Sequence, residues 1–408
     1  MISRIIFSIT ALLLLGGGLY FSINLGFPQL KWKKLFKGFN NKQSLGITPF
    51  KSLMMSLGAR IGVGSIAGIA LAIYIGGIGT IFWIWIVGII TSINSYCESY
   101  LGYKYHGGPS SYINNRLLSK VYAVLIILAY IIGFMTIQAN TITISSCNYI
   151  NTTPKTVAII LVIITFLSIF KGLKSIINIT SKIVPIMGIT YIILSIIIII
   201  NNINIIPMVF ISIIKSAWNI KSLIPALLIG ITRGTFATEA GLGTGAISSS
   251  LVKTNNNEIE LSLVQILGIY FTVFIVCTST ALIIITSKYN NLSFNSINGI
   301  ELTQYALNYH LGSYGSIVLL ISIILLAYST IIVGYYYGES SLKYLTKHKI
   351  GIYILRISTL LLLYIGSLSN SNSLWNIVDY FVSLLAIINM STLLYHRKEI
   401  IFAYKSKL

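Results

Sequence analysis

The chain is a series of long apolar runs joined by short polar connections, and this pattern decides the class of fold. Eleven runs reach the length of about 17 residues that a helix needs to cross a bilayer. Runs so long and unbroken exclude an outer-membrane barrel, whose strands alternate over about ten residues. We therefore expect an all-α integral membrane protein with about 11 transmembrane helices. The expected spans are residues 5–24, 49–74, 78–103, 119–146, 155–171, 182–200, 221–250, 259–287, 314–341, 350–367 and 374–394.

Two of the apolar segments are interrupted by glycines and charged residues. The first reads Gly58-Ala-Arg60-Ile-Gly-Val-Gly-Ser-Ile-Ala-Gly68, and the second reads Arg233-Gly-Thr-Phe-Ala-Thr-Glu239-Ala-Gly-Leu-Gly-Thr-Gly245. An ionisable residue at bilayer depth costs at least about 2.5 kcal/mol, so it normally faces a partner or a watery cavity. Glycines let the backbone leave the helix, which lipid tolerates only where protein or water covers the freed groups. Two broken spans in separate halves of one chain indicate the binding site of a transporter.

The positions of the breaks indicate an internal repeat. If the first span is set aside, ten remain, and the breaks fall in the first and the sixth, as in a leucine-transporter-like 5+5 inverted repeat. We expect an extra N-terminal helix and basic loop at 1–48, repeats at 49–204 and 205–395, and a basic tail at 396–408. Half-helix ends at the breaks expose partly positive N–H groups and partly negative carbonyls, which suit a zwitterion and a cation.

Charge is scarce but unevenly distributed. Charged residues make up 9% of the chain, against about 25% in soluble domains, and the net charge is +20. One set of connections and the C-terminal tail hold eighteen basic residues, and the opposite set holds five. By the positive-inside rule this predicts a plasma (cytoplasmic) membrane protein with its N-terminus outside and its C-terminus cytoplasmic. The excess of basic residues therefore indicates the membrane topology and a contact with anionic membrane lipid. Nucleic acid is not an expected partner.

The two sets of basic residues are as follows. The inner set is Lys31, Lys33, Lys34, Lys37, Lys42, Lys104, Arg116, Lys171, Lys174, Lys182, Lys253, Lys343, Lys347, Lys349, Arg397, Lys398, Lys405 and Lys407, and the outer set is Arg4, Lys155, Lys215, Lys221 and Lys288.

A series of short motifs resembles the alanine or glycine:cation symporter family, sodium-coupled amino-acid transporters with the leucine-transporter fold. The likeness runs from about Leu19 to Met390 and rests on the order and spacing of the motifs together. The matching pieces are Gly46-Ile-Thr-Pro49-Phe50, Gly62/Gly64/Ile66-Ala67-Gly68, Gly76-Gly-Ile-Gly79-Thr-Ile-Phe82-Trp83, Glu98, Gly107-Gly108-Pro109-Ser-Ser-Tyr112, Gln138-Ala139-Asn140, Arg233-Gly234, Glu239-Ala-Gly-Leu-Gly243, Ser329-Thr330, Gly338-Glu339 and Trp375 with Asp379.

The resemblance implies a Na⁺ site between the first broken helix and the eighth core helix. Its ligands would be the carbonyls of Gly58, Ile61 and Leu326 and the hydroxyls of Ser329 and Thr330. The last three positions are spaced i, i+3 and i+4, so they share one helical face. These two hydroxyls could instead only bond back to carbonyls one turn earlier, as membrane Ser and Thr often do.

The resemblance also implies where the amino acid binds. Its carboxylate would meet the amides near Val63 and Gly64. The other proposed substrate contacts are Ser65, Gln138, Asn140, Thr235, Phe236 and Thr238. The implied function is uptake of a small neutral amino acid such as alanine or glycine, driven by Na⁺ and with H⁺ as the alternative coupling ion. The oligomeric state is left open.

The sequence departs from the family at several polar positions. Arg60-Ile-Gly-Val-Gly-Ser65 stands where members usually have Thr-Val-Gly-Thr-Gly-Asn, and Ala237-Thr238 replaces Ser-Asn. In the last core helix Val382-Ser383 replaces Asn-Gly, and Ile388 replaces proline. One hypothesis is that Arg60 supplies a fixed positive charge in place of a cation, giving uncoupled or proton-linked transport. Another is a sensor that binds an amino acid without concentrating it. A channel would need a charged or carbonyl-lined filter, which we do not find.

The remaining charged residues suggest structural or gating roles. Arg233 and Glu239 lie six residues apart across a break, and we expect an ion pair between them ahead of direct substrate contact. Glu98, Glu339 and Asp379 are expected to be tertiary hydrogen-bond partners, with an inner-gate role as the alternative. The cysteines Cys97, Cys147 and Cys277 are isolated, and no Ser/His/Asp, Cys/His or His/Glu set converges, so we expect no enzyme chemistry.

Overall fold

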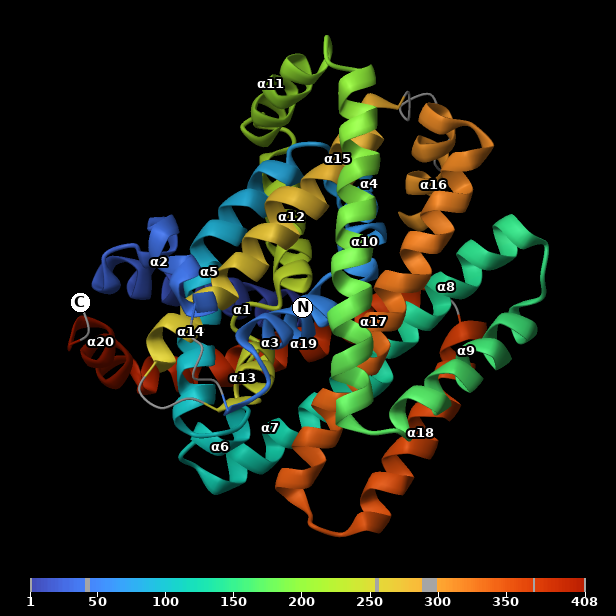
Figure 1. The fold of residues 1–408 in the computed structure, drawn as a ribbon. Helices are drawn as coiled ribbons and strands as arrows, with labels where there is room; N and C mark the ends of the chain where they lie inside the picture. Colours follow the sequence, from blue (N-terminus) through green and yellow to red (C-terminus); the bar gives the residue numbers. More distant parts are fainter. Residues whose placement is uncertain (1, 41–44, 254–256, 288–298, 370, 407–408) are drawn as a thin grey trace.

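The computed structural model describes residues 2–40, 45–253, 257–287, 299–369 and 371–406, and they form one bundle of helices (Figure 1). The first half of the chain contains α1 (Ile2–Leu25), α3 (Pro49–Arg60), α4 (Ala67–Gly76), α5 (Thr80–Lys104), α7 (Arg116–Leu128), α8 (Met135–Ile150), α9 (Pro154–Ile169) and α10 (Leu173–Asn201). The second half contains α12 (Leu223–Thr238), α13 (Thr244–Ser249), α14 (Glu258–Tyr270), α15 (Thr278–Thr286), α17 (Ser313–Leu345), α18 (Lys349–Leu368) and α19 (Ser371–Tyr395).

Shorter elements connect these helices. They are η1 (Pro28–Leu30), α2 (Trp32–Lys37), η2 (Gly38–Asn40), η3 (Val63–Ser65), α6 (Pro109–Tyr112), α11 (Ile206–Ala217), α16 (Gly299–Leu311) and α20 (Arg397–Ser406). Two π-helical segments, η4 (Ala129–Phe134) and η5 (Phe271–Cys277), join α7 to α8 and α14 to α15. A two-stranded antiparallel sheet pairs β1 (Leu45–Gly46) with β2 (Val252–Lys253). We call the two ends of the bundle the α6 end and the α16 end.

Local sequence signals set several helix starts. Thr48 caps α3 by accepting a hydrogen bond from the Lys51 amide, and Pro49 fills the first helical position, where no N–H is needed. The same Thr-Pro pair, Thr153 and Pro154, starts α9. Within the long helix α10, Pro185 is accommodated without ending the helix.

The helices form two groups. In the first group, α5 packs along α14 and against both α12 and α13. In the second group, α8 packs along α17 and α18, and α18 also packs against α9. The short helix α3 lies between the groups, because it contacts α10, α17, α13 and α14. The breaks between α3 and α4 and between α12 and α13 therefore lie where the two groups meet.

Each of the eleven expected spans coincides with a helix or a broken helix. Among the described residues, eight helices are long and apolar enough to cross a membrane, and the pair α3 and α4, bent by 65°, makes nine. The helices α9 and α12 are apolar but shorter, so the count of eleven is not confirmed. The expected start at residue 182 was wrong by nine residues, since α10 begins at Leu173. The polar stretch Asn178 to Lys182 looked like a connection but is helical.

The short helix α16 carries Glu301 to His310 and packs against α4 and α17. Residues 288–298, which precede it in the same connection, lie outside the described residues. Most of the basic tail expected at 396–408 forms α20, an amphipathic helix with Ile400 and Tyr404 buried.

Candidate functional site

The first break interrupts the α-helical hydrogen-bond pattern between Arg60 and Ala67. Helix α3 ends at Arg60, Gly62 is extended with φ −115° and ψ −153°, and the turn η3 leads into α4. The Ser65 hydroxyl donates to the Gly62 carbonyl at 2.9 Å, which closes the turn. The Val63 amide donates to the side-chain oxygen of Gln138 at 3.0 Å, so α8 holds the break from the side. This confirms the broken helix that the glycines predicted.

Oxygen atoms gather where α17 passes the end of α3. The Ser329 hydroxyl lies 3.1 Å from the Gly58 carbonyl and 2.7 Å from the Leu326 carbonyl. The Thr330 hydroxyl lies 2.9 Å from the Gly58 carbonyl, 3.2 Å from that of Ala59 and 3.2 Å from that of Leu326. Both hydroxyls thus bond back along α17 and also reach across to α3. Every one of these residues is buried.

Four of the five expected ion ligands are therefore together. The fifth, Ile61, is the C-cap of α3, and its amide donates to the Leu57 carbonyl. Ala59 joins the set through its carbonyl, which the sequence did not single out.

A stack of aromatic rings covers the first break. Phe236 of α12 lies so close to Gly64 that a Cβ atom there would be 2.3 Å from the ring. The Phe236 ring stacks on Phe134 at a centroid distance of 4.9 Å and meets Trp375 at 5.1 Å. Phe134 in turn stacks on Tyr130 at 4.7 Å. These rings come from η4, α12 and α19, so three helices meet over a backbone that only glycine allows.

The second break is a loop of left-handed residues. Glu239, Gly241 and Gly243 have φ values of 50°, 86° and 92°, and α13 begins at the next residue. Two of the three are glycines, which adopt this conformation without a steric penalty. Loops of this kind turn successive backbone N–H groups toward one side and form an anion-binding concavity.

The Glu98 carboxylate of α5 fills that concavity. It accepts hydrogen bonds from the amides of Gly241 at 3.2 Å, Gly243 at 2.8 Å and Gly245 at 3.2 Å. The side-chain amide of Asn389 donates to the same carboxylate at 3.3 Å and to the Gly241 carbonyl at 2.9 Å. Glu98 is fully buried. It therefore fixes the shape of the second break and is the tertiary partner expected from the sequence.

Arg60 reaches toward Glu98 and away from the oxygen cluster. Its guanidinium donates to the Ser95 hydroxyl at 2.9 Å and to the Gln265 carbonyl at 3.4 Å, and it lies 3.9 Å from the Glu98 carboxylate. These partners belong to α5 and α14, whereas Ser329 and Thr330 belong to α17. The guanidinium charge is thus placed on the opposite side of α3 from the expected ion ligands.

The expected ion pair between Arg233 and Glu239 does not form. Arg233 pairs with Asp379 of α19 at 2.7 Å, and its guanidinium lies 4.8 Å from the centre of the Trp375 ring. Glu239 accepts a hydrogen bond from the Thr244 hydroxyl at 3.0 Å. The reason is that Arg233 sits within α12, more than one turn before the break, and faces α19. The prediction of a structural pair was right for Arg233 and wrong about its partner.

A chain of hydrogen bonds connects the second break to α20. Tyr112 donates to Asn389 at 2.7 Å, and His396 lies 2.9 Å from the Tyr112 carbonyl and 2.9 Å from the Glu399 carboxylate. Lys104 meets that carboxylate at 2.7 Å. Burial raises the pKa of Glu399, but hydrogen bonds from Lys104 and His396 outweigh burial and leave that pKa below its usual value.

The other predicted residues are spread over the bundle. Thr238 bonds weakly to the Thr235 carbonyl at 3.4 Å, and both lie beside Phe236 at the end of α12. Asn140 is turned toward the Ser369 carbonyl at 2.7 Å and lines a cavity of about 460 Å³ at the α16 end, so it is not brought next to Val63. Glu339 pairs with Lys343 near the end of α17.

Several residues of the site were missed by reasoning from the sequence. Asn389 and Ser95 lie in helices with no local break, and Phe134 looks like an ordinary membrane aromatic, whereas Trp375 belonged to a family motif but had no predicted role. Phe134 lies in the π-helical segment η4, and π-helical turns are frequent at functional sites. A π-helical turn leaves no clear pattern in a single sequence.

Comparison with known proteins gives consistent results. The model of the sodium:alanine symporter family matches residues 1–406. The probable sodium/glutamine symporter GlnT of Bacillus subtilis (strain 168) is 34% identical, with 96% of this chain and 86% of that protein covered. The sodium/alanine symporter AgcS of Methanococcus maripaludis is 32% identical, with 94% and 90% covered. The fold resembles that of MhsT, solved in complex with L-phenylalanine, with a TM-score of 0.63, 15% identity and 85% and 88% coverage. The leucine-transporter-like fold is thereby confirmed.

Proposed function

Because the chain belongs to the sodium:alanine symporter family, we propose that it takes up a small neutral amino acid, such as alanine or glycine, together with Na⁺. The family and the fold make it a multi-pass membrane transporter and not an enzyme. The observation that carries the finer proposal is the oxygen cluster that Ser329 and Thr330 form with the carbonyls at the end of α3.

The oxygen cluster has the chemistry of a sodium site. It offers neutral oxygens only, from the carbonyls of Gly58, Ala59 and Leu326 and from two hydroxyls. On binding Na⁺, each hydroxyl would rotate its proton away from the carbonyl and coordinate the ion through an oxygen lone pair. Each carbonyl would then contact the ion in place of the hydroxyl proton that it accepts now. The Ile61 carbonyl would complete the set. Because α3 lies between the two helix groups and α17 belongs to one of them, ion binding would tie α3 to the group that contains α8 and α17.

The amino acid would bind beside the first break. Its carboxylate would take the amides near Val63 and Gly64, which requires Gln138 to release the Val63 amide. Phe236 would face the side chain of the substrate, with Thr235, Thr238 and Ser65 as polar neighbours. The Phe236 ring already fills the space beside Gly64, so it would have to move to admit a substrate, and a small side chain such as that of alanine or glycine would need the least movement. Asn140 would contact the substrate in the cavity at the α16 end, before the substrate reaches the first break.

Transport would proceed by alternating access. The repeats at 49–204 and 205–395 would place the two breaks in equivalent positions, and the group containing α5 and α14 would rock against the group containing α8 and α17. The buried pair of Arg233 and Asp379 would close the α16 end, and Glu98 would keep the second break in shape during the motion. We place the N-terminus outside and the C-terminus in the cytoplasm, because the basic residues gather at the α6 end.

Uptake of labelled alanine by purified protein in vesicles tests this proposal, with sodium and proton gradients imposed separately. We expect accumulation that collapses when the sodium gradient is removed. Accumulation driven only by a proton gradient would favour the proton-linked alternative. Binding of alanine with no accumulation under either gradient would overturn symport and favour a sensor.

Replacing Phe236 by alanine should broaden the substrate range. The change removes the ring that lies against Gly64 and leaves a cavity between Phe134 and Trp375. We expect alanine uptake to fall about 10-fold or more, since a missing contact of one or two methylenes costs about 1–3 kcal/mol. Valine and leucine, tested as competitors, should inhibit the variant better than the parent protein. Phe166→Ala, an exposed ring on α9, is the control and should leave the competition profile unchanged.

A further inference from the structure

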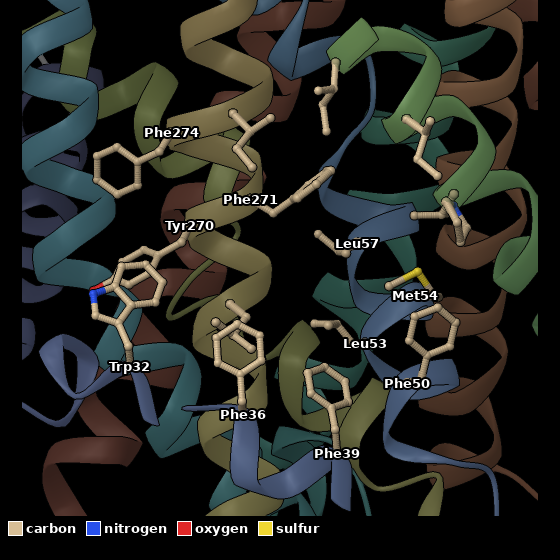
Figure 2. A pocket seen from close by; sticks show the side chains of 16 residues that line it. Trp32, Phe36, Phe39, Phe50, Leu53, Met54, Leu57, Tyr270, Phe271 and Phe274 are labelled. Carbon is tan, nitrogen blue, oxygen red and sulfur yellow. The ribbon is translucent and has the colours of Figure 1, made fainter. Parts of the chain in front are cut away.

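A large apolar groove opens on the side of the bundle, away from the proposed transport site. It has a volume of about 700 Å³ and lies between α3, α10 and the segment formed by α14 and η5 (Figure 2). Trp32 and Phe36 of α2 close it toward the α6 end, where Trp32 meets Tyr270 at a ring distance of 5.3 Å. The α14 and η5 residues that line it, Leu267 to Ile275, span about 12 Å along the helix axis at 1.5 Å per residue.

The groove opens on the outer surface of the bundle, and apolar side chains that are exposed at this surface form its rim. Phe50 is 46% exposed, Ile189 is 58% exposed and Trp32 is 56% exposed. An apolar opening of this size on a soluble protein would mark an interaction site. Here it lies on helices that span the membrane, so the molecules that reach it are lipids. Its length of about 12 Å covers most of one leaflet, because the hydrocarbon core is about 30 Å thick.

Lysines cluster where the groove meets the α6 end. Lys33, Lys34 and Lys37 belong to α2 and alternate with the lining residues Trp32 and Phe36. Lys51 follows Phe50 at the start of α3, and Lys182 precedes Val184 on α10. Among the described residues, no ion pair engages any of these five lysines. Basic side chains at a membrane surface attract anionic lipid, each contributing roughly a fivefold factor in binding.

We propose that the groove is a specific site for an anionic phospholipid, with one acyl chain lying between α3, α10 and α14 and the headgroup held by the lysines of α2. The acyl chain meets an almost entirely apolar lining along its length, and the phosphate meets positive charge where the groove ends. The lipid contacts α3, which also carries the Gly58 carbonyl of the oxygen cluster, so it touches the same helix as the proposed ion site.

Quenching of Trp32 fluorescence by brominated phospholipids tests the site on the full chain. Brominated phosphatidylglycerol and brominated phosphatidylcholine are each added at the same minor fraction to phosphatidylcholine vesicles. The Trp32 signal is obtained by subtracting the emission of a Trp32→Phe variant. We expect phosphatidylglycerol to quench Trp32 well beyond phosphatidylcholine. Equal quenching by the two lipids would mean general annular lipid only and would overturn the proposal.

Two sets of variants separate the headgroup from the acyl chain. Lys33→Gln, Lys34→Gln and Lys37→Gln together should lower the preference for phosphatidylglycerol by roughly fivefold per lysine, whereas Lys398→Gln with Lys405→Gln on α20 should not.

Filling the groove with Ile189→Phe and Ile192→Phe should remove the excess quenching, whereas Ile196→Phe with Ile197→Phe, on the same helix but outside the groove, should leave it. An unchanged preference in the triple lysine variant, or unchanged quenching in the filled variant, would contradict the assignment. The fluorescence readout does not depend on transport, so it stands or fails separately from the proposed function.

Discussion

Replacing Thr330 by valine is expected to raise the Na⁺ concentration needed for half-maximal alanine uptake by about 10- to 100-fold. Valine has almost the same shape but lacks the hydroxyl that lies 2.9 Å from the Gly58 carbonyl. A hydrogen bond or ligand contact to a charged group contributes about 1.5–3 kcal/mol. The hydroxyl also touches the break itself, since a Cβ atom at Gly62 would be 2.5 Å from it. The measurement is the sodium dependence of initial uptake rates in vesicles.

Thr359→Val provides the matched control for Thr330→Val. Thr359 is also a buried membrane threonine, but its hydroxyl bonds only to the Leu355 carbonyl, one turn earlier in α18. We expect Thr359→Val to leave the sodium dependence unchanged, which separates loss of an ion ligand from a general cost of removing a buried hydroxyl. If Thr330→Val takes up alanine with the sodium dependence of the parent protein, the oxygen cluster is not the coupling site.

Glu98→Gln is expected to be among the most destabilising single substitutions in the described part of the chain. It removes the charge that three backbone amides and Asn389 stabilise, and it leaves the Arg60 guanidinium buried without its carboxylate. Removing one partner of a buried pair typically costs about 3–5 kcal/mol. The expected result is a clear fall in the thermal unfolding midpoint of the purified protein, together with loss of uptake.

A double-mutant cycle identifies the cause of this loss. Arg60→Gln combined with Glu98→Gln should cost less than the sum of the two single changes, because the double variant leaves no uncompensated charge. Lys343→Gln serves as the surface control. That lysine is 53% exposed in its pair with Glu339, and such pairs contribute about 0–1 kcal/mol. Strict additivity of the Arg60 and Glu98 effects would show that the two groups do not interact at 3.9 Å.

Much of the fold follows from local patterns in the sequence. Apolar length locates the spans, and the glycines around Gly62 and Gly241 locate both breaks, because backbone geometry is a local property. The start of α10 was misplaced for a related reason. Polar residues near Lys182 interrupt the apolar run, but in a helix they need only face the end of the bundle or the lipid headgroups.

The partners of the buried charges could not be predicted from one sequence. Arg233 and Glu239 are close along the chain, but α12 turns the arginine toward Asp379, which is 146 residues away. The Glu98 carboxylate likewise depends on where three amides of a distant loop point. Such contacts are fixed by how helices pack. By contrast, the family resemblance pointed to Ser329 and Thr330, and both lie beside the end of α3, where their role as ion ligands stays a prediction.

The small sheet of β1 and β2 links the two broken helices mechanically. Strand β1 lies three residues before α3, and β2 lies three residues after α13, with Leu45 opposite Lys253 and Gly46 opposite Val252. The half-helix before the first break, α3, and the half-helix after the second break, α13, are therefore tied together at the α6 end. A tilt of one half-helix must carry the other with it or first unzip the ladder. We therefore expect the two half-helices to move together for as long as the ladder stays paired.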